Sequence, residues 1–364
     1  MIARTFEVLL TMLVVGALLA EDPCNAIQLI STLGLITPWI YFPCRPLFYY
    51  LSAVETPTTS AAMMATSTKK NNQCPPFVIE PTAQHMHSLI LLHGLGSNGE
   101  KFGKELIESG VSSNGKRLVD IFPGAKFIFP TSRKRRSTAF GRAMLRQWFD
   151  VGSLDEPSHR QEVQLQGLAE SSQEILQLIN EESQKISREN IILGGLSQGC
   201  ALGLACLLTL DFPLGGFIGM SGWLPFQHEI ERAAKGEEYM DDDNPFGSDT
   251  DDPFANSDEG VPKVQDPIVR VMDFSRDLLC LQSLGNPCKA NSSILTPVFL
   301  GHGEVDDKIK LHFGKSGYET LISCGFCVTW KSYRDQGHWY KIPDEIDDLV
   351  EFIREKVGWH MEKT

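Results

Sequence analysis

A serine flanked by glycines lies at residues 195–199, where Gly-Leu-Ser-Gln-Gly fits the pattern G-x-S-x-G. The pentapeptide follows an apolar run at 190–193 that predicts a strand, and it opens an apolar stretch, 197–210, that predicts a helix. In a strand–turn–helix of this kind the serine sits on a tight corner above the sheet, and the glycines leave room for neighbouring backbone. The start of the helix supplies N–H groups and a positive dipole end. Ser197 is therefore the candidate nucleophile of an acyl-transfer reaction.

A nucleophilic serine needs a base and an acid that orients the base. In a parallel sheet both are expected at strand ends, in the chain order serine, acid, histidine. The predicted strand Pro297–Leu300 is followed by an acidic turn, GHGEVDD. This turn offers three candidate acids, Glu304, Asp306 and Asp307.

One histidine has the position expected of the base. His338 lies in the loop RDQGHWY, directly after the predicted strand Cys327–Tyr333. Of the other histidines beyond the acid, His312 falls within a predicted helix and His360 in the C-terminal tail. His302, at a strand end before the acid, is interpreted as structural. His338 is therefore the candidate base.

A glycine-rich loop, LHGLGSNG at 92–99, follows the predicted strand 87–93. A loop in this place can bring a backbone N–H towards the serine, so that two donors hold the oxyanion of a tetrahedral intermediate. The best-placed donors are the N–H groups of Leu95 and of Gln198, the residue after the nucleophile. A plain turn is the alternative, and a phosphate loop is disfavoured because the chain has no G-x-x-x-x-G-K-[ST] pattern.

Short apolar strands alternate with amphipathic helices from Phe77 onward, and this alternation predicts an α/β fold with a mainly parallel sheet covered by helices on both faces. The predicted strands are 87–93, 126–130, 190–193, 216–220, 297–300 and 327–333. The predicted helices are 101–120, with a break near 110–115, then 163–185, 197–210, 307–323 and 343–357.

Six segments carry a family resemblance, and they occur in this order: LLHGLGSNG, QWFD at 147–150, GGLSQGCAL, SGWLP at 221–225, GHGEVDD and GHWY. Together they resemble the acyl-protein thioesterase, or phospholipase/carboxylesterase, family of α/β hydrolases. The resemblance runs from about Phe77 to Trp359 and excludes most of 228–293. The C-terminal GHWYKIPDEIDDLVEF is most similar to fungal-type members.

The resemblance implies an α/β-hydrolase fold and a serine hydrolase that uses neither metal nor cofactor. The family's H-G-x-x-D pattern falls on residues 302–306, which implies Asp306 as the acid beside Ser197 and His338. It places the oxyanion donors on Leu95 and Gln198. Trp148 is similar to a residue that lines the acyl-binding region, with a core tryptophan as the alternative.

The implied substrates are S-palmitoylated proteins, whose acyl thioester would be hydrolysed. The nearest alternative is a carboxylesterase or lysophospholipase that acts on short-chain or lipid esters. A more distant alternative is a non-catalytic binding protein that uses its acidic segment. A transient contact with a membrane surface is also considered, because the basic run 133–136 lies in a predicted loop before QWFD and could meet an anionic surface.

Charge is concentrated in one segment of the 364 residues. Residues 236–260 hold ten acids and no Lys or Arg, so the rest of the chain carries a formal charge of −3 against −13 for the whole. This balance disfavours nucleic acid as a partner. The long connection 228–293 is interpreted as an insertion, disordered at 236–265. Its function is interpreted as that of a solvated loop, with partner binding as the alternative.

The N-terminus, 1–75, is interpreted as an extension before a hydrolase domain at 76–360. Residues 1–20 have the charged head and short apolar run of a secretory signal. Alternatively, translation begins at Met63 or Met64, and the enzyme is cytoplasmic. We expect the cytoplasmic location, with the secretory pathway as the outcome if the signal is genuine. The C-x-x-C pair Cys324 and Cys327 is interpreted as two buried thiols, with a metal or redox site as the alternative.

Overall fold

A computed structural model of the chain describes residues 74–237, 265–284, 289 and 292–359. The chain divides into two units, Met1–Lys69 and Lys70–Thr364, and all described residues belong to the second. The predicted extension, 1–75, and the predicted disordered run, 236–265, therefore lie almost wholly outside the described residues. The domain boundaries at 76 and 360 stay a prediction.

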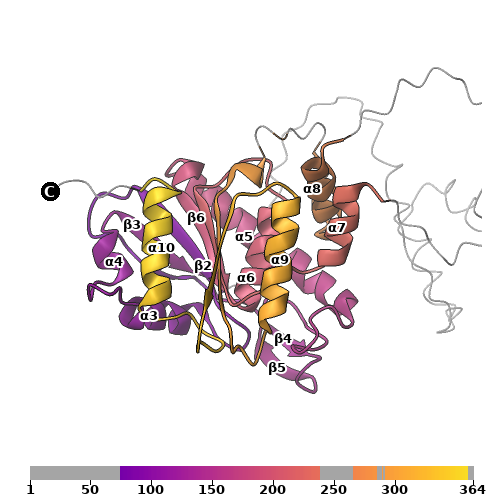
Figure 1. The fold of residues 1–364 in the computed structure, drawn as a ribbon, viewed down its shortest axis with the longest axis horizontal. Coiled ribbons are helices and arrows are strands. Elements are labelled where there is room, and N and C mark those ends of the chain that lie inside the picture. Colours follow the sequence, from indigo (N-terminus) through magenta and orange to yellow (C-terminus); the bar gives the residue numbers. More distant parts are fainter. Residues whose placement is uncertain (1–73, 238–264, 285–288, 290–291, 360–364) are drawn as a thin grey trace, which may run out of the picture. The chain divides into compact units, whose positions relative to one another are not determined.

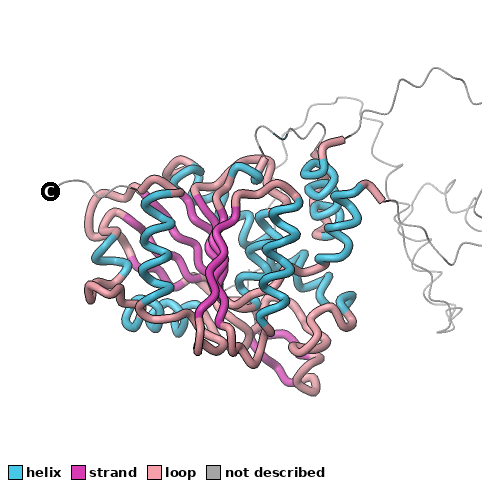
Figure 2. Tube along the Cα trace, viewed as in Figure 1, coloured by secondary structure: helices cyan, strands magenta, loops and turns pink. Residues whose placement is uncertain are grey.

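A seven-stranded sheet forms the centre of the described part, in the order β1-β3-β2-β6-β7-β8-β9 (Figures 1 and 2). Only β1 runs antiparallel to its neighbour, β3, and the other five pairs are parallel. The predicted mainly parallel sheet is thus confirmed. The strands are β1 (Phe77–Ile79), β2 (His87–Leu92), β3 (Ala125–Phe129), β6 (Ile191–Leu196), β7 (Gly216–Met220), β8 (Val298–Gly303) and β9 (Val328–Tyr333).

Helices cover both faces of the sheet, as predicted (Figure 1). One face packs against α3 (Gly99–Ser109), α4 (Leu118–Ile121) and α10 (Asp344–Glu355). The other packs against α5 (Leu165–Ser183), α6 (Gln198–Leu207), α7 (Gln227–Lys235), α8 (Pro267–Leu278) and α9 (Leu311–Ser323). Short 3-10 helices occupy Gln161–Gln164, Arg188–Asn190 and Ser293–Leu295. Among the described residues, no helix has the length and apolar character needed to cross a membrane.

The central strands β2 and β6 have nearly uninterrupted apolar sequences because they are buried. All six residues of β6 are buried, as are five of the six in β2, because helices cover both sides of these strands. All ten residues of α6 are buried as well, so this helix has no polar stripe. Ser197 lies between β6 and α6, so two fully buried elements hold it.

The basic run before QWFD forms a strand, so the predicted loop was wrong. β4 (Lys134–Ser137) pairs antiparallel with β5 (Ala143–Arg146) in a separate two-stranded sheet. The sequence gives no alternation of apolar residues here, because the hairpin stands on the surface and only Ser137 of its strand residues is buried. Arg135 donates to Glu170 of α5 at 2.7 Å, which ties the hairpin to the body.

Both described ends of the predicted insertion are helical. The second of these ends forms α8, with Ile268, Val271 and Met272 buried. The preceding helix, α7, was missed, because it is short and strongly charged and Ile230 is its buried residue. Arg270 donates through Nε to the carbonyl of Ala233 at 2.9 Å, so the two helices are joined.

Candidate active site

Ser197 occupies a strained corner at the end of β6. Its φ of 57° and ψ of −119° lie in a region that residues with a side chain rarely adopt. The N–H of Ser197 donates to the carbonyl of Met220 at 2.8 Å, which fixes the corner to β7. A Cβ on Gly199 would lie 2.2 Å from the carbonyl oxygen of Leu92, so the second glycine of the motif is required by the close approach of β2.

His338 joins Ser197 to Asp306. The Ser197 hydroxyl donates to His338 Nε2 at 2.9 Å, and His338 Nδ1 donates to Asp306 Oδ2 at 2.8 Å. The three residues follow β6, β9 and β8, which lie at separate places in the chain but at one edge of the sheet. Ser197 and Asp306 are buried, and the ring of His338 is partly exposed. The arrangement allows a proton to pass from the hydroxyl to the imidazole.

Asp306 is held as a carboxylate by its surroundings. Burial alone would raise the pKa of Asp306, but hydrogen bonds from His302 and His338 outweigh it and bring the pKa well below its usual range. The backbone N–H groups of Lys308 and Ile309 donate to Asp306 Oδ1 at 2.8 and 3.0 Å. A permanent negative charge beside His338 Nδ1 stabilises an imidazolium.

The other two candidate acids, Glu304 and Asp307, bond to groups other than His338. Glu304 Oε1 accepts from the Ser332 hydroxyl at 2.9 Å, and Asp307 is exposed and pairs with Lys308 at 3.0 Å. Of the three carboxylates that the sequence left open, the structure brings only Asp306 to the histidine.

An apolar cavity of about 280 Å³ opens at Ser197. Leu95 and Gln198 line it, so both predicted oxyanion donors belong to the same cavity as the serine. Neither of their N–H groups donates to a backbone carbonyl within the described part of the chain. The remaining walls are mostly apolar, from Phe102, Phe140, Leu154, Leu196, Ile309 and Trp339, with the exposed Lys308 at the edge.

Comparison with known proteins agrees with this geometry. The sequence pattern of the phospholipase/carboxylesterase family matches residues 73–240. The acyl-protein thioesterase 1 of Candida albicans is 33% identical over 270 residues, which cover 73% of this chain and 90% of that protein. The chain belongs to the acyl-protein thioesterase, or phospholipase/carboxylesterase, family. It is a serine hydrolase with an α/β-hydrolase fold.

Other relatives, at lower identity, extend the same family likeness along the chain. The acyl-protein thioesterase 1 of Gibberella zeae is 26% identical and covers 78% of this chain and 95% of its own length. The crystal structure of Zea mays acyl-protein thioesterase 2 superposes with a TM-score of 0.53 at 23% identity, covering 78% of this chain and 99% of that one. This structural likeness supports the fold.

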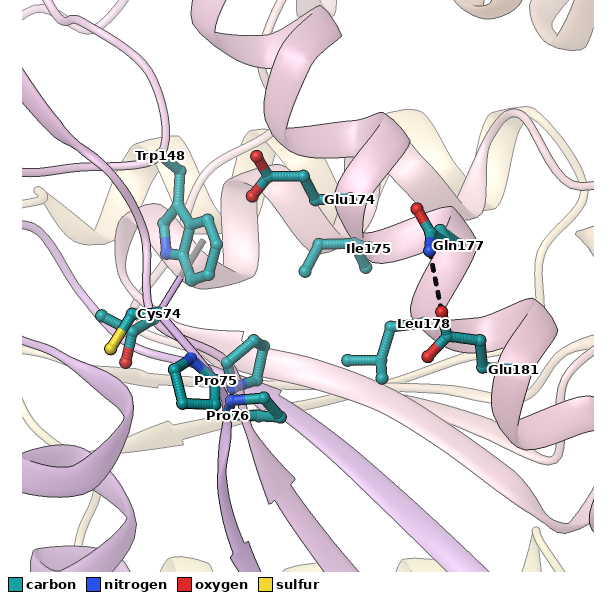
Figure 3. Close-up of a pocket in the computed structure, with 11 residues that line it drawn as sticks. Cys74, Pro75, Pro76, Trp148, Glu174, Ile175, Gln177, Leu178 and Glu181 are labelled. Carbon is teal, nitrogen blue, oxygen red and sulfur yellow. Dashed lines mark hydrogen bonds between the residues drawn. The ribbon is translucent and has the colours of Figure 1, made fainter. Parts of the chain in front are cut away.

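Trp148 is not among the residues that line the cavity at Ser197, and its place in the acyl-binding region stays a prediction. It is 1% exposed and borders a different cavity, of about 310 Å³, between residues 74–76 and helix α5. Figure 3 shows its indole ring at one wall of that cavity, opposite Ile175 and Leu178.

Sequence reasoning missed the second histidine beside the acid as part of the site. His302 was interpreted as structural, and it is 1% exposed. Its Nε2 lies 2.9 Å from the carbonyl oxygen of Ile309 and 3.4 Å from Asp306 Oδ2. Because both neighbours are acceptors, Nε2 carries a proton. The pattern H-G-x-x-D contained the signal, since its histidine and its aspartate follow one strand.

Proposed function

We propose that this serine hydrolase cleaves acyl thioesters and esters, with Ser197 as nucleophile, His338 as base and Asp306 as the orienting acid. The observation that carries the proposal is the unbroken line of hydrogen bonds from the Ser197 hydroxyl through His338 to Asp306, at the mouth of an apolar cavity. No cofactor or metal enters the proposed reaction, because the three side chains supply the proton and the electron pair.

The reaction proceeds in two halves. His338 Nε2 takes the hydroxyl proton while Ser197 Oγ attacks the acyl carbonyl, and the N–H groups of Leu95 and Gln198 hold the oxyanion. The tetrahedral intermediate collapses, the bond to the thiol or alcohol breaks, and the imidazolium returns its proton to that leaving group. Water, deprotonated by His338, then attacks the acyl-enzyme and releases the fatty acid, which restores Ser197.

The proposed natural substrate is a protein S-palmitoylated on cysteine. The curated relatives are named acyl-protein thioesterases, and the apolar walls of the cavity at Ser197 suit an acyl chain. A carboxylesterase or lysophospholipase acting on short-chain or lipid esters is the second candidate, favoured by the name of the family whose pattern matches the chain.

Hydrolysis of an S-palmitoylated peptide and of a short-chain p-nitrophenyl ester by the purified protein decides between these substrates. We expect a much larger kcat/KM for the palmitoylated peptide, and we expect Ser197→Ala to abolish both reactions. Equal or greater efficiency on the short-chain ester favours the second candidate. Unchanged hydrolysis by Ser197→Ala contradicts the proposed mechanism.

The β4–β5 hairpin supports a transient contact with an anionic membrane surface. Lys134, Arg136 and Arg142 are exposed, and none of the three has an ion-pair partner among residues with a described position. Arg136 stands opposite Met144, which is 53% exposed, and Phe140 at the turn is 46% exposed. Cationic and apolar side chains on one surface are typical of membrane-interface segments. Phe140 also lines the cavity at Ser197, so the contact would face the acyl chain.

Vesicle co-sedimentation tests this contact. We expect the protein to bind vesicles that contain phosphatidylserine more strongly than vesicles of phosphatidylcholine alone. We expect Arg136→Glu to bind both kinds of vesicle equally weakly. Lys101→Glu, an exposed cation on α3, serves as the control for charge alone. An equal loss in both variants contradicts a specific role of the hairpin.

We propose a cytoplasmic location for the enzyme. The described residues include six free cysteines, and free thiols persist in a reducing compartment. Mass spectrometry of the native N-terminus tests the proposal. A start at Met63 or Met64 agrees with it, and a start near Glu21 indicates a cleaved secretory signal.

A further inference from the structure

The loop that carries Leu95 is bonded to a tryptophan behind the active site. Trp148 Nε1 donates to the carbonyl of His93 at 2.8 Å. This carbonyl lies two residues before Leu95, whose N–H is one of the two proposed oxyanion donors. The same indole ring packs on the imidazole of His93, with ring centroids 4.9 Å apart.

The second proposed donor is bonded to the same short segment. Gln198 Oε1 accepts from the backbone N–H of Trp148 at 2.9 Å, and Gln198 Nε2 donates to the carbonyl of Phe149 at 2.8 Å. The amide of Gln198 is therefore bonded through both its oxygen and its nitrogen to two consecutive residues of the QWFD motif. These two bonds tie the residue that carries the second donor to the QWFD motif.

The segment between these two contacts is itself anchored to α5. The Ser171 hydroxyl donates to the carbonyl of Trp148 at 2.6 Å. A Cβ on Gly167 would lie 2.5 Å from Phe149 Cα, so the helix and the motif are in direct contact. Trp148 thus spans from the body of the protein to the loop that carries Leu95.

His93 completes the arrangement as a neutral ring of defined tautomer. Its Nδ1 donates to the carbonyl of Gly94 at 2.7 Å, and its Nε2 accepts from the N–H of Ser132 at 3.1 Å. Burial lowers the pKa of His93 to about 4, so the ring stays neutral and keeps these bonds at neutral pH. The backbone on both sides of Gly94 is thereby held.

We propose that Trp148 is a positioning residue that sets the distance between the two oxyanion donors, through its indole N–H to the Leu95 loop and its backbone N–H to Gln198. The inference rests on the proposed acyl-transfer function. An oxyanion hole stabilises the transition state only if both donors are oriented before charge develops. A loosened loop therefore lowers kcat and leaves the binding of the acyl chain largely unchanged.

A second hydrogen bond to the loop that carries Leu95 limits the fall in kcat expected when the indole bond is removed. The N–H of Gly96 donates to the carbonyl of Arg146 at 2.8 Å, so the loop stays attached when the indole bond is removed. Removal of one oxyanion donor costs about 100- to 1,000-fold in kcat, and loss of a supporting contact costs about 10- to 100-fold. We expect Trp148→Phe to fall in the second range.

Two tryptophan variants form a matched test. Trp148→Phe keeps most of the ring and removes the N–H. Trp223→Phe makes the same change at another buried tryptophan, whose Nε1 has no hydrogen-bond partner among the described residues. The assays are kcat and KM for p-nitrophenyl butyrate, and inhibition by an alkyl boronic acid, which forms a tetrahedral adduct with the serine.

For Trp148→Phe we expect kcat to fall about 10- to 100-fold, KM to stay within about twofold, and the boronic acid to bind more weakly by a factor similar to the fall in kcat. For Trp223→Phe we expect kcat and boronic-acid affinity within about threefold of wild type. Gln198→Met removes the side-chain bonds from the other end and keeps the backbone N–H. Gln198→Met replaces Trp148→Phe in the test if Trp148→Phe does not fold, and we expect it to lower kcat by a similar factor.

The experiments distinguish failure of the proposed function from failure of the positioning role of Trp148. Wild-type hydrolysis that Ser197→Ala does not abolish overturns the proposed function, and the role of Trp148 with it. A Ser197-dependent enzyme in which Trp148→Phe behaves like Trp223→Phe overturns only the positioning role. A rise in KM without a fall in kcat also overturns it, since Trp148 would then act on substrate binding.

Discussion

Glu345 provides a stability prediction with a calculable size. The side chain is 1% exposed at the start of α10, and burial, with the nearby charge of Asp348, raises its pKa from 4.5 to about 8. One oxygen accepts from the N–H of Lys341 at 2.8 Å, close after His338 in the chain. The other oxygen has no hydrogen-bond partner among the residues described.

The raised pKa of Glu345 lowers the free energy of unfolding at neutral pH. Below pH 4.5 the carboxyl is protonated in both the folded and the unfolded chain, so it costs nothing. Above that pH the unfolded chain releases the proton and the folded protein keeps it until pH approaches 8, so stability falls over this range. Each pH unit costs about 1.4 kcal/mol, which amounts to roughly 3 kcal/mol at pH 7.

The substitution Glu345→Gln removes this cost. The amide keeps an acceptor for Lys341 and cannot ionise, so we expect the free energy of unfolding at pH 7 to rise by roughly 3 kcal/mol. We also expect the gain to shrink towards pH 4.5. The assay is urea unfolding between pH 5 and 9, with Glu351→Gln as the control, because Glu351 is an exposed residue of the same helix.

A gain for Glu345→Gln that does not change with pH refutes the reasoning, since the effect would then come from packing. A variant less stable than wild type at pH 7 also refutes it, because an ionised Glu345 would then be stabilising.

Two other predictions follow from the geometry. Asp306→Asn should lower kcat about 10,000-fold with little effect on KM, because an amide cannot both accept from His338 Nδ1 and accept the two backbone N–H groups; steady-state kinetics check this against Asp307→Asn, which should remain near wild type. Cys200 and Cys206 should resist iodoacetamide in the native protein, because burial raises the pKa of each thiol to about 12. Mass spectrometry should find modification at Cys74, Cys280 and Cys327, which are exposed; the interpretation of Cys327 as a buried thiol was therefore wrong. Labelling of Cys200 or Cys206 before unfolding would contradict their burial.

Where the sequence has a regular pattern, the fold could be predicted from it. The strand at 216–220 was found with its exact bounds, because a fully buried parallel strand is a short apolar run between turns. The helix from Leu165 was found because its apolar residues recur at helical spacing. The β4–β5 hairpin has neither signal, since its strands are mostly exposed and charged.

The candidate site, like the fold, could be predicted only in part from the sequence. The order of Ser197, the acidic turn and His338 along the chain predicted that these segments meet, because strand ends of a parallel sheet lie at one edge. What the order cannot express is which side a buried ring faces, so the cavity that Trp148 borders could not be predicted. Glu345 was not singled out, because nothing in a helical acidic stretch shows that one of its carboxyls is buried.

Labelling with a fluorophosphonate, followed by peptide mapping, tests the central claim most directly. The reagent forms a covalent bond with a serine that a neighbouring base has activated. We expect one labelled residue, Ser197, with no labelling in Ser197→Ala and much slower labelling in Asp306→Asn. Labelling of a different serine, or equal labelling of Ser197→Ala, would contradict the account.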